Sequence, residues 1–275
     1  MAVFEIDAYS PRQVAAQVQA VGVVKARLPL LAMYMLGVCA GGFIGLGSLY
    51  SVLVFSDPTL PFVAGRLLGG VAFSLGLVLV VVAGAELFTG NNLLVMAWAD
   101  GMITTAEVAR NWIVVYLANA VGAIGLALVV WLSQHGDLNQ GAVAATYVEI
   151  AALKTALPFW EAFFKGVLCN LLVCLAVWMA MAGRGVTDKI IAVVFPISAF
   201  VAAGFEHCVA NMYLIPLGIL LSTEVPAVTP APDWWGLVSN LVPVTLGNIA
   251  GGSIMIAAVY HLVYGRALKK GSWNS

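Results

Sequence analysis

One short stretch decides how this chain folds: residues 204–211, with the sequence GFEHCVAN. It places a carboxylate beside an imidazole, Glu206 and His207, between two uncharged segments, 190–205 and 208–223. Each segment is shorter than the roughly 20 residues that a helix needs to cross a bilayer, and together they exceed one straight span. We therefore predict one broken membrane span with its polar groups turned inward. Ionisable side chains at that depth normally face a cavity or a partner, so the break marks a candidate functional site.

The composition of the chain is that of an integral membrane protein. Of its 275 residues 62% are hydrophobic and only 9% are charged, and the mean hydropathy is +1.01, whereas soluble domains have about 25% charged residues. The apolar runs are long and do not alternate, which indicates helices rather than a β-barrel. The net charge of −1 gives no indication of nucleic-acid binding, and residues 1–13 lack the basic start of a cleavable signal. Four cysteines lie in apolar stretches without metal-binding spacing, so we expect no metal and no cofactor.

The apolar runs predict six membrane spans. They cover residues 28–55, 67–99, 111–134, 158–183, 190–223 and 240–264. Glu86 cuts the second span and leaves a half-span after it, so the second and fifth spans are both broken. The chain then divides into an N-terminal cytoplasmic amphipathic helix, a first three-helix half, an external loop, a second three-helix half and a cytoplasmic tail: 1–27, 28–134, 135–157, 158–265 and 266–275.

The N-terminal helix is expected over residues 10–25. Ser10 and Gln13 match a capping box, with a proline at the first helical position. One face carries three valines, Val14, Val18 and Val21. This pattern predicts a helix at the membrane interface, with a gate under the pore as the alternative.

Basic residues set the expected orientation of the chain. With both termini inside, the inner segments hold nine of them: Arg12, Lys25, Arg27, Arg110, Arg184, Lys189, Arg266, Lys269 and Lys270. The outer segments hold three: Arg66, Lys154 and Lys165. Because basic residues favour the cytoplasmic side, both termini are predicted to be cytoplasmic.

The two breaks resemble each other and indicate an internal repeat. Glu86 and Glu206 each follow a glycine by two residues and precede an asparagine by five. Downstream, Asn111, Val115, Leu117, Asn119 and Gly122 recur at Asn240, Val244, Leu246, Asn248 and Gly251. Because each half has an odd number of spans, the second half enters from the opposite side, which predicts an inverted repeat with its broken helices near the midplane. Exposed N–H groups at the half-helix N-termini favour anions, and the two glutamates are expected to cap the freed N–H groups of their own break.

Two motifs carry a resemblance to a known family. Residues 84–91, GAELFTGN, and 204–212, GFEHCVANM, resemble the signature loops of the formate/nitrite transporter family. The similarity extends from the first span to the sixth. It implies an all-α, aquaporin-like protomer with an inverted 3+3 repeat, in a homopentamer with one pore per subunit and lipid on the central axis. It also implies small monovalent anions as substrates and a multi-pass location in the inner membrane.

The resemblance gives roles to a central polar group. His207 resembles the pore histidine of the family, and Thr89 resembles its partner on the other loop. Asn248 and Glu206 resemble the groups that orient these two, and Asn170 is expected nearby on the fourth span. Together they form the predicted substrate path, in which the histidine donates a hydrogen bond or a proton.

The resemblance also implies two hydrophobic constrictions and a charged vestibule. The residues that resemble one constriction are Phe73, Leu77 and Phe200, and those that resemble the other are Leu87, Phe88 and Val173. Lys154 resembles the basic residue of the outer vestibule. Anions are expected to enter there and to lose their water at the constrictions.

The predicted function is a channel or transporter for small weak-acid anions. Formate is the first expected substrate, with nitrite or hydrosulfide as the alternative, because residues 73–77 resemble formate channels and residues 153–156 resemble nitrite-type members. A membrane enzyme using the Glu206–His207 pair would need a cofactor motif or metal cluster, and the sequence has neither. A neutral-solute channel of the aquaporin type would carry paired Asn-Pro-Ala motifs, which are absent.

Overall fold

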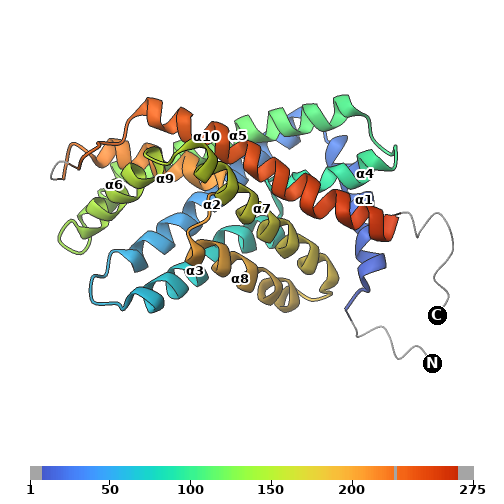
Figure 1. Ribbon diagram of the computed structural model, residues 1–275, viewed down its shortest axis with the longest axis horizontal. Helices are drawn as coiled ribbons and strands as arrows, with labels where there is room; N and C mark the ends of the chain where they lie inside the picture. Colours follow the sequence, from blue (N-terminus) through green and yellow to red (C-terminus); the bar gives the residue numbers. More distant parts are fainter. Residues whose placement is uncertain (1–7, 226–227, 266–275) are drawn as a thin grey trace.

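The computed structural model describes residues 8–225 and 228–265, and its regular structure there is helical (Figure 1). Among the described residues, six helices are long and apolar enough to cross a membrane. They are α2 (Leu30–Phe55), α3 (Phe62–Leu79) with its π-helical end η2 (Val80–Gly84), α5 (Thr105–Leu132), α7 (Phe159–Ala182), α8 (Val186–Ala203), and α10 (Trp234–Ile249) with π-helical η5 (Ala250–Ala258) and η6 (His261–Gly265). The predicted all-α membrane protein with six spans is confirmed.

Both predicted breaks are present, and each leads into a second, shorter helical segment. After η2 the helix is interrupted, and the chain continues as the 3-10 turn η3 (Gly90–Leu93) and α4 (Leu94–Ala99). After α8 it is interrupted again and continues as α9 (Cys208–Leu221). Helices α3 and α8, which lead into the two breaks, pack side by side. The broken second and fifth spans are therefore neighbours.

A left-handed glycine ends the first half-helix at each break. Gly84 has a φ of 83° and Gly204 a φ of 74°, values that residues with a Cβ rarely adopt. In both cases the N–H of the next residue donates to the carbonyl five residues earlier, at 3.0 Å. This is the Schellman arrangement, which satisfies a carbonyl that the ending helix leaves free. The two breaks therefore begin in the same way for the same reason.

The second span begins earlier than the apolar run predicts, at Phe62 instead of residue 67. Arg66 interrupts the run, but its guanidinium donates to the carbonyls of Val201 and Ala202, at 2.9 Å each. These carbonyls belong to the last turn of α8, which a cation stabilises. The charge is thus satisfied inside the bundle and does not mark the end of a span.

The segment 135–157, predicted as a loop, instead contains a 3-10 turn, η4 (His135–Asp137), and a 14-residue helix, α6 (Ala142–Thr155). Val143, Tyr147 and Ala151 recur at four-residue spacing and are fully buried. This face packs against α9. The segment is too short and too weakly apolar to span a membrane, so its sequence resembles that of a loop.

The N-terminal helix forms as predicted and packs against the bundle. Helix α1 (Pro11–Ala26) begins with the expected capping box between Ser10 and Gln13. Val14 and Val18 are buried against α4 and α7 in a small apolar cluster, whereas Val21 of the predicted face is 37% exposed. The predicted tail 266–275, with Arg266, Lys269 and Lys270, and the first seven residues lie outside the described part.

The same packing pattern occurs in both halves of the chain. Helix α2 packs on α3 and α5, as α7 packs on α8 and α10. Helix α1 packs on α4, as α6 packs on α9. At close approaches the glycines also correspond: a Cβ on Gly122 would collide with the carbonyl of Val38, and one on Gly251 with that of Val167. The inverted repeat therefore includes α1 and α6 in addition to the three spans of each half.

Candidate functional site

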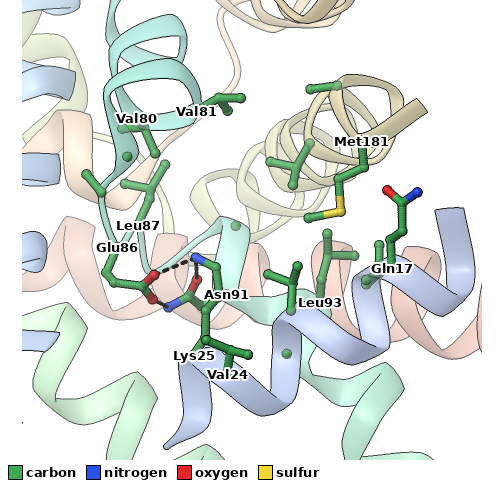
Figure 2. A pocket seen from close by; sticks show the side chains of 18 of the residues that line it. Gln17, Val24, Lys25, Val80, Val81, Glu86, Leu87, Asn91, Leu93 and Met181 are labelled. Atoms are coloured by element: carbon green, nitrogen blue, oxygen red, sulfur yellow. Dashed lines mark hydrogen bonds and ion pairs between the residues drawn. The ribbon is translucent and has the colours of Figure 1, made fainter. Parts of the chain in front are cut away.

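Two cavities approach the breaks from different parts of the bundle. The first, of about 890 Å³, lies between α1, the end of α3 and the first break, and its lining includes Lys25, Glu86 and Leu87 (Figure 2). The second, of about 530 Å³, is lined by residues of α3, α6, α8 and the second break, including Lys154 and His207. The two cavities share no lining residue. A packed barrier therefore separates them.

The barrier is apolar apart from the imidazole of His207 and the hydroxyl of Thr89, which is fully buried and lines neither cavity. Leu77 and Leu87 close the first cavity, and Phe73, Phe200 and His207 line the second. The Phe73 and Phe200 rings meet edge to face with centroids 5.4 Å apart, and Phe200 stacks on the imidazole at 6.0 Å. Leu77 lines the same cavity as Leu87, although the family resemblance grouped Leu77 with Phe73 and Phe200.

Two other residues of the predicted constrictions are buried in the protein and line neither cavity. Phe88 is 3% exposed and Val173 is 1% exposed. The Phe88 ring packs edge to face against Tyr116, with centroids 4.9 Å apart, and lies 6.2 Å from the ring of Trp112. These contacts place Phe88 against α5.

His207 bonds through both of its ring nitrogens. Its Nδ1 accepts a hydrogen bond from the Ala210 N–H at 3.1 Å, so the imidazole acts as the N-cap of α9. Its Nε2 lies 3.0 Å from Oγ1 of Thr89. Because Nδ1 is an acceptor here, the neutral ring carries its proton on Nε2, and this N–H donates a hydrogen bond to the threonine hydroxyl. The threonine hydroxyl then keeps its own proton for another acceptor.

Asn170 supports Thr89 from behind. Its Nδ2 lies 3.2 Å from the carbonyl of Thr89, 2.8 Å from Oδ1 of Asn92 and 2.7 Å from the carbonyl of Asn248. Asn170 is fully buried and lines neither cavity. The structure therefore brings it to the predicted group as a support for the threonine backbone.

Asn248 holds the second break. Its Oδ1 accepts from the N–H of Cys208 at 3.0 Å, and its Nδ2 donates to the carbonyls of Glu206 and Gly166 at 2.9 and 2.8 Å. The Cys208 N–H and the Glu206 carbonyl are backbone groups that the interrupted helix cannot pair by itself, whereas Gly166 belongs to the neighbouring helix α7. One amide side chain thus fixes the residues on both sides of His207.

Asn119 holds the first break with the same three bonds. It accepts from the N–H of Phe88 at 2.9 Å and donates to the carbonyls of Glu86 and Gly37 at 2.9 and 2.8 Å. The sequence comparison matched this asparagine to Asn248 without giving it a role. The bonds explain why both positions need a side chain that accepts and donates at once.

The glutamates do not cap the freed N–H groups, contrary to the expectation from sequence. Glu206 pairs with Lys154, at 2.8 Å between Nζ and Oε1, and accepts from the amide of Asn211 at 2.7 Å. The amide of Asn211 also donates to Asn240 Oδ1 at 2.7 Å, and Asn240 in turn donates to the carbonyl of Lys154 at 2.9 Å. The asparagines satisfy the backbone, which leaves the carboxylate to pair with the lysine.

The first break has the equivalent network, and Figure 2 shows its Lys25, Glu86 and Asn91 side chains. Lys25 of α1 lies 2.8 Å from Oε1 of Glu86 and 3.0 Å from Oδ1 of Asn91. The amide of Asn91 donates to Glu86 at 2.7 Å and to Asn111 at 2.9 Å, and Asn111 donates to the carbonyl of Lys25 at 3.1 Å. From the sequence, Lys25 was only one of the nine basic residues expected on the inner side. The overlooked signal is its separation of 129 residues from Lys154, the same as from Asn111 to Asn240.

The fold and this arrangement define a class of membrane protein: a six-span protomer in which two broken helices from inverted halves meet at a buried polar pair. Comparison with known proteins then identifies the family. Residues 12–262 match the model of the family described as formate/nitrite transporter. The chain belongs to the formate/nitrite transporter family.

The relatives include named channels. The formate channel FocA of Escherichia coli strain K12 is 40% identical over 271 residues, which cover 94% of this chain and 95% of that protein. The formate channel FocA of Haemophilus influenzae is 42% identical over 241 residues, covering 81% of this chain and 83% of the relative.

Solved structures support the same fold. A structure described as a pentameric formate channel with formate bound has a TM-score of 0.80 at 36% identity and covers 86% of this chain and 97% of its own. The aquaglyceroporin of Plasmodium falciparum, at 14% identity, has a TM-score of 0.53 and covers 85% of this chain and all of its own. The second likeness concerns the fold alone and agrees with the predicted aquaporin-like architecture.

Proposed function

We propose that this protein is a homopentameric channel for small monovalent weak-acid anions, with formate as its principal substrate and one pore in each subunit. The observation that carries the proposal is the His207–Thr89 pair, buried in an apolar barrier between two cavities with cationic side chains. The 40% identity to a formate channel over nearly the whole chain supports the choice of substrate. So does the likeness to a pentameric channel with formate bound.

The distribution of basic residues supports an orientation with both termini in the cytoplasm of a cell whose inner membrane holds the channel. The first cavity then opens to the cytoplasm and the second to the outside. Lys25 and Lys154 give each cavity a cation near the barrier. Each lysine is paired with the glutamate of its own break, which lines the same cavity, so it offers the anion an ammonium hydrogen-bond donor near the barrier rather than an uncompensated charge.

At the barrier the anion exchanges water for a small number of hydrogen-bond donors. Moving a carboxylate into an apolar passage without partners costs several kcal/mol or more. Thr89 offsets part of this cost, because its hydroxyl accepts a hydrogen bond from the Nε2–H of His207 and can donate a hydrogen bond to the substrate oxygen. The phenyl and leucyl side chains around the pair exclude most water and hydrated cations.

The N-cap bond of His207 favours hydrogen-bond donation over proton donation as its first role. A cationic imidazole would carry a proton on Nδ1, facing the N–H of Ala210, and would lose that bond. Protonation therefore requires the ring to leave the cap of α9. In this mechanism the resting channel stabilises the anion through Thr89, and a proton reaches the substrate only after the ring has moved.

The proposal is tested by reconstituting the purified protein in liposomes. Rates of formate, nitrite, hydrosulfide and glycerol flux are compared at pH 5.5 and pH 7.5. We expect formate to pass fastest and glycerol to be excluded. Glycerol flux comparable to formate flux would favour a neutral-solute channel, and no flux of any anion would overturn the proposal.

A variant pair locates the function in the barrier. His207→Phe removes both ring nitrogens and is expected to abolish pH-dependent formate flux while the oligomer remains intact. His135→Phe is the matched control, because His135 lies in η4 and lines neither cavity. Equal flux in both variants would show that the imidazole at 207 takes no part in conduction.

A further inference from the structure

At each break, a residue of the barrier is followed by a residue that occupies the equivalent place in the two halves. Leu87 is followed by Phe88, and His207 is followed by Cys208. The N–H of each following residue is held by the asparagine of its own half, at 2.9 and 3.0 Å. Phe88 and Cys208 are buried, 3% and 0% exposed, and neither lines a cavity. They therefore anchor the two loops, and the barrier residues move with them.

Each anchor touches a side chain that lies one helical turn before the asparagine of its own half, Asn119 or Asn248. The ring of Phe88 packs edge to face on Tyr116 of α5, with centroids 4.9 Å apart. The side chain of Cys208 lies beside that of Thr245 on α10. Tyr116 and Thr245 are separated by 129 residues, which is the repeat offset of the flanking helices. They are the same position of the fold in its two halves.

These two equivalent positions meet. The hydroxyl of Tyr116 lies 2.9 Å from Oγ1 of Thr245, a hydrogen bond between a residue of the first half and its counterpart in the second. A contact between equivalent positions of an inverted repeat lies at the pseudo-two-fold axis that relates the halves. A continuous chain of side-chain contacts thus runs from Phe88 through this bond to Cys208.

We propose that Tyr116 and Thr245 are positioning residues that set the separation of the two loops and thereby the size selectivity of the barrier. The inference rests on the proposed anion conduction. Breaking the hydrogen bond between the two hydroxyls frees Phe88 and Cys208 to shift. The distance between Leu87 and the imidazole of the second break then changes. A wider passage raises the flux of a small anion such as formate only slightly, whereas it raises the flux of an anion larger by one methyl group more.

The experiment measures the ratio of formate to acetate flux in liposomes for Tyr116→Phe, Thr245→Val and the double variant. Each single variant removes only the bond and keeps most of the packing volume. We expect the ratio to fall about two- to tenfold in each, the size of effect that one buried hydrogen bond supports. The double variant should lower the ratio no further, because the bond is already broken in each single variant.

Two further variants separate positioning from loss of stability. Thr245→Ser restores a hydroxyl at the same place and should restore the ratio. Tyr147→Phe is the matched control: it breaks another buried hydroxyl–hydroxyl bond, 2.9 Å between Tyr147 and Tyr213, which joins α6 to α9 and touches neither anchor. The control should keep the wild-type ratio.

The outcomes distinguish this inference from the function on which it rests. An unchanged ratio in both single variants, additive losses in the double variant, or an equal loss in the control would overturn the positioning role while the wild-type protein still conducts formate. Absence of formate flux in the wild-type protein would instead overturn the proposed function itself.

Discussion

The two breaks of this protein share one framework and differ in the side chains that it presents. In both, a lysine from a peripheral helix lies 2.8 Å from the glutamate, and an asparagine five residues on donates to that glutamate at 2.7 Å. A second asparagine in each half, Asn119 or Asn248, bonds two backbone groups of its own break and one carbonyl of a neighbouring helix. Five of the eight positions in 84–91 and 204–211 differ, and among them Leu87, Phe88 and Thr89 in the first break stand where the second has His207, Cys208 and Val209. The repeated glutamates, asparagines and lysines form the framework, and the unrepeated pair His207 and Thr89 is the one to which we assign the proposed conduction.

The difference also appears in how the second half-helices start. His207 caps α9 through its Nδ1. In the first break Thr89 occupies the position before η3, but its side chain makes no capping bond. The hydroxyl is thus available to the imidazole of the other half. The polar pair exists because one loop uses its side chain as a cap and the other does not.

The strongest way to break the shared framework is to remove its bracing asparagines. Asn119→Leu and Asn248→Leu each leave one N–H and two carbonyls without their side-chain partner. Leaving a buried polar group without its hydrogen bond costs about 1–3 kcal/mol. We therefore expect the free energy of unfolding to fall by about 3 kcal/mol or more in both variants. Thermal unfolding of the purified oligomer in detergent measures it. A loss in only one of the two variants would contradict their equivalence.

The asymmetric positions are tested by making the first break more like the second. Thr89→Val introduces the residue type found at position 209 and removes the hydroxyl at nearly constant volume. We expect formate flux to fall about ten- to a hundredfold, since a hydrogen bond to a charged group contributes about 1.5–3 kcal/mol.

Thr89→Ser is the control for this prediction, because it keeps the hydroxyl and loses only a methyl group. Its flux should stay near that of the wild-type protein in the same liposome assay. If the valine variant conducts as well as the serine variant, the hydroxyl does not serve the anion.

The architecture was predictable because polar residues are rare in this chain and their spacing repeats. Glu86 and Glu206 interrupt apolar runs that are otherwise long enough to be spans, which locates both breaks within a few residues. The helix α6 was missed for the opposite reason, because its apolar face is narrow and rich in alanine. The offset of 129 residues would have revealed it: Val14 and Val18 of α1 correspond to Val143 and Tyr147, and all four are buried.

The partners within the site were less predictable than its members. Nothing near Glu206 in the sequence indicates that its carboxylate pairs with Lys154, 52 residues earlier, so capping of the local N–H groups was the natural expectation. Likewise, periodicity does not distinguish a phenylalanine that lines a passage from one that anchors a loop. Phe73 and Phe88 are both buried, yet only the first lines a cavity. Such distinctions depend on how helices from different halves meet.

The smallest expected effects compare the lysines of the two networks. The side chain of Lys25 is 24% exposed and that of Lys154 is 16% exposed, while each paired glutamate is 6% exposed. Replacing either lysine by methionine leaves a nearly buried carboxylate without its cation. The loss in the free energy of unfolding should lie between that for breaking a surface ion pair and that for breaking a fully buried one. We expect about 1–2 kcal/mol in each variant, and slightly more for Lys154.

Lys165→Met is the matched control for this comparison, because Lys165 lies on α7 in an exposed pair with Glu161, four residues earlier. Such a pair contributes about 0.5 kcal/mol or less, so the control should unfold at nearly the wild-type temperature. If the control loses as much stability as Lys25→Met, the networks at the breaks are no more than surface ion pairs. If Lys25→Met is silent while Lys154→Met is destabilising, the symmetry of the framework is limited to its geometry, and only the second break depends on its lysine.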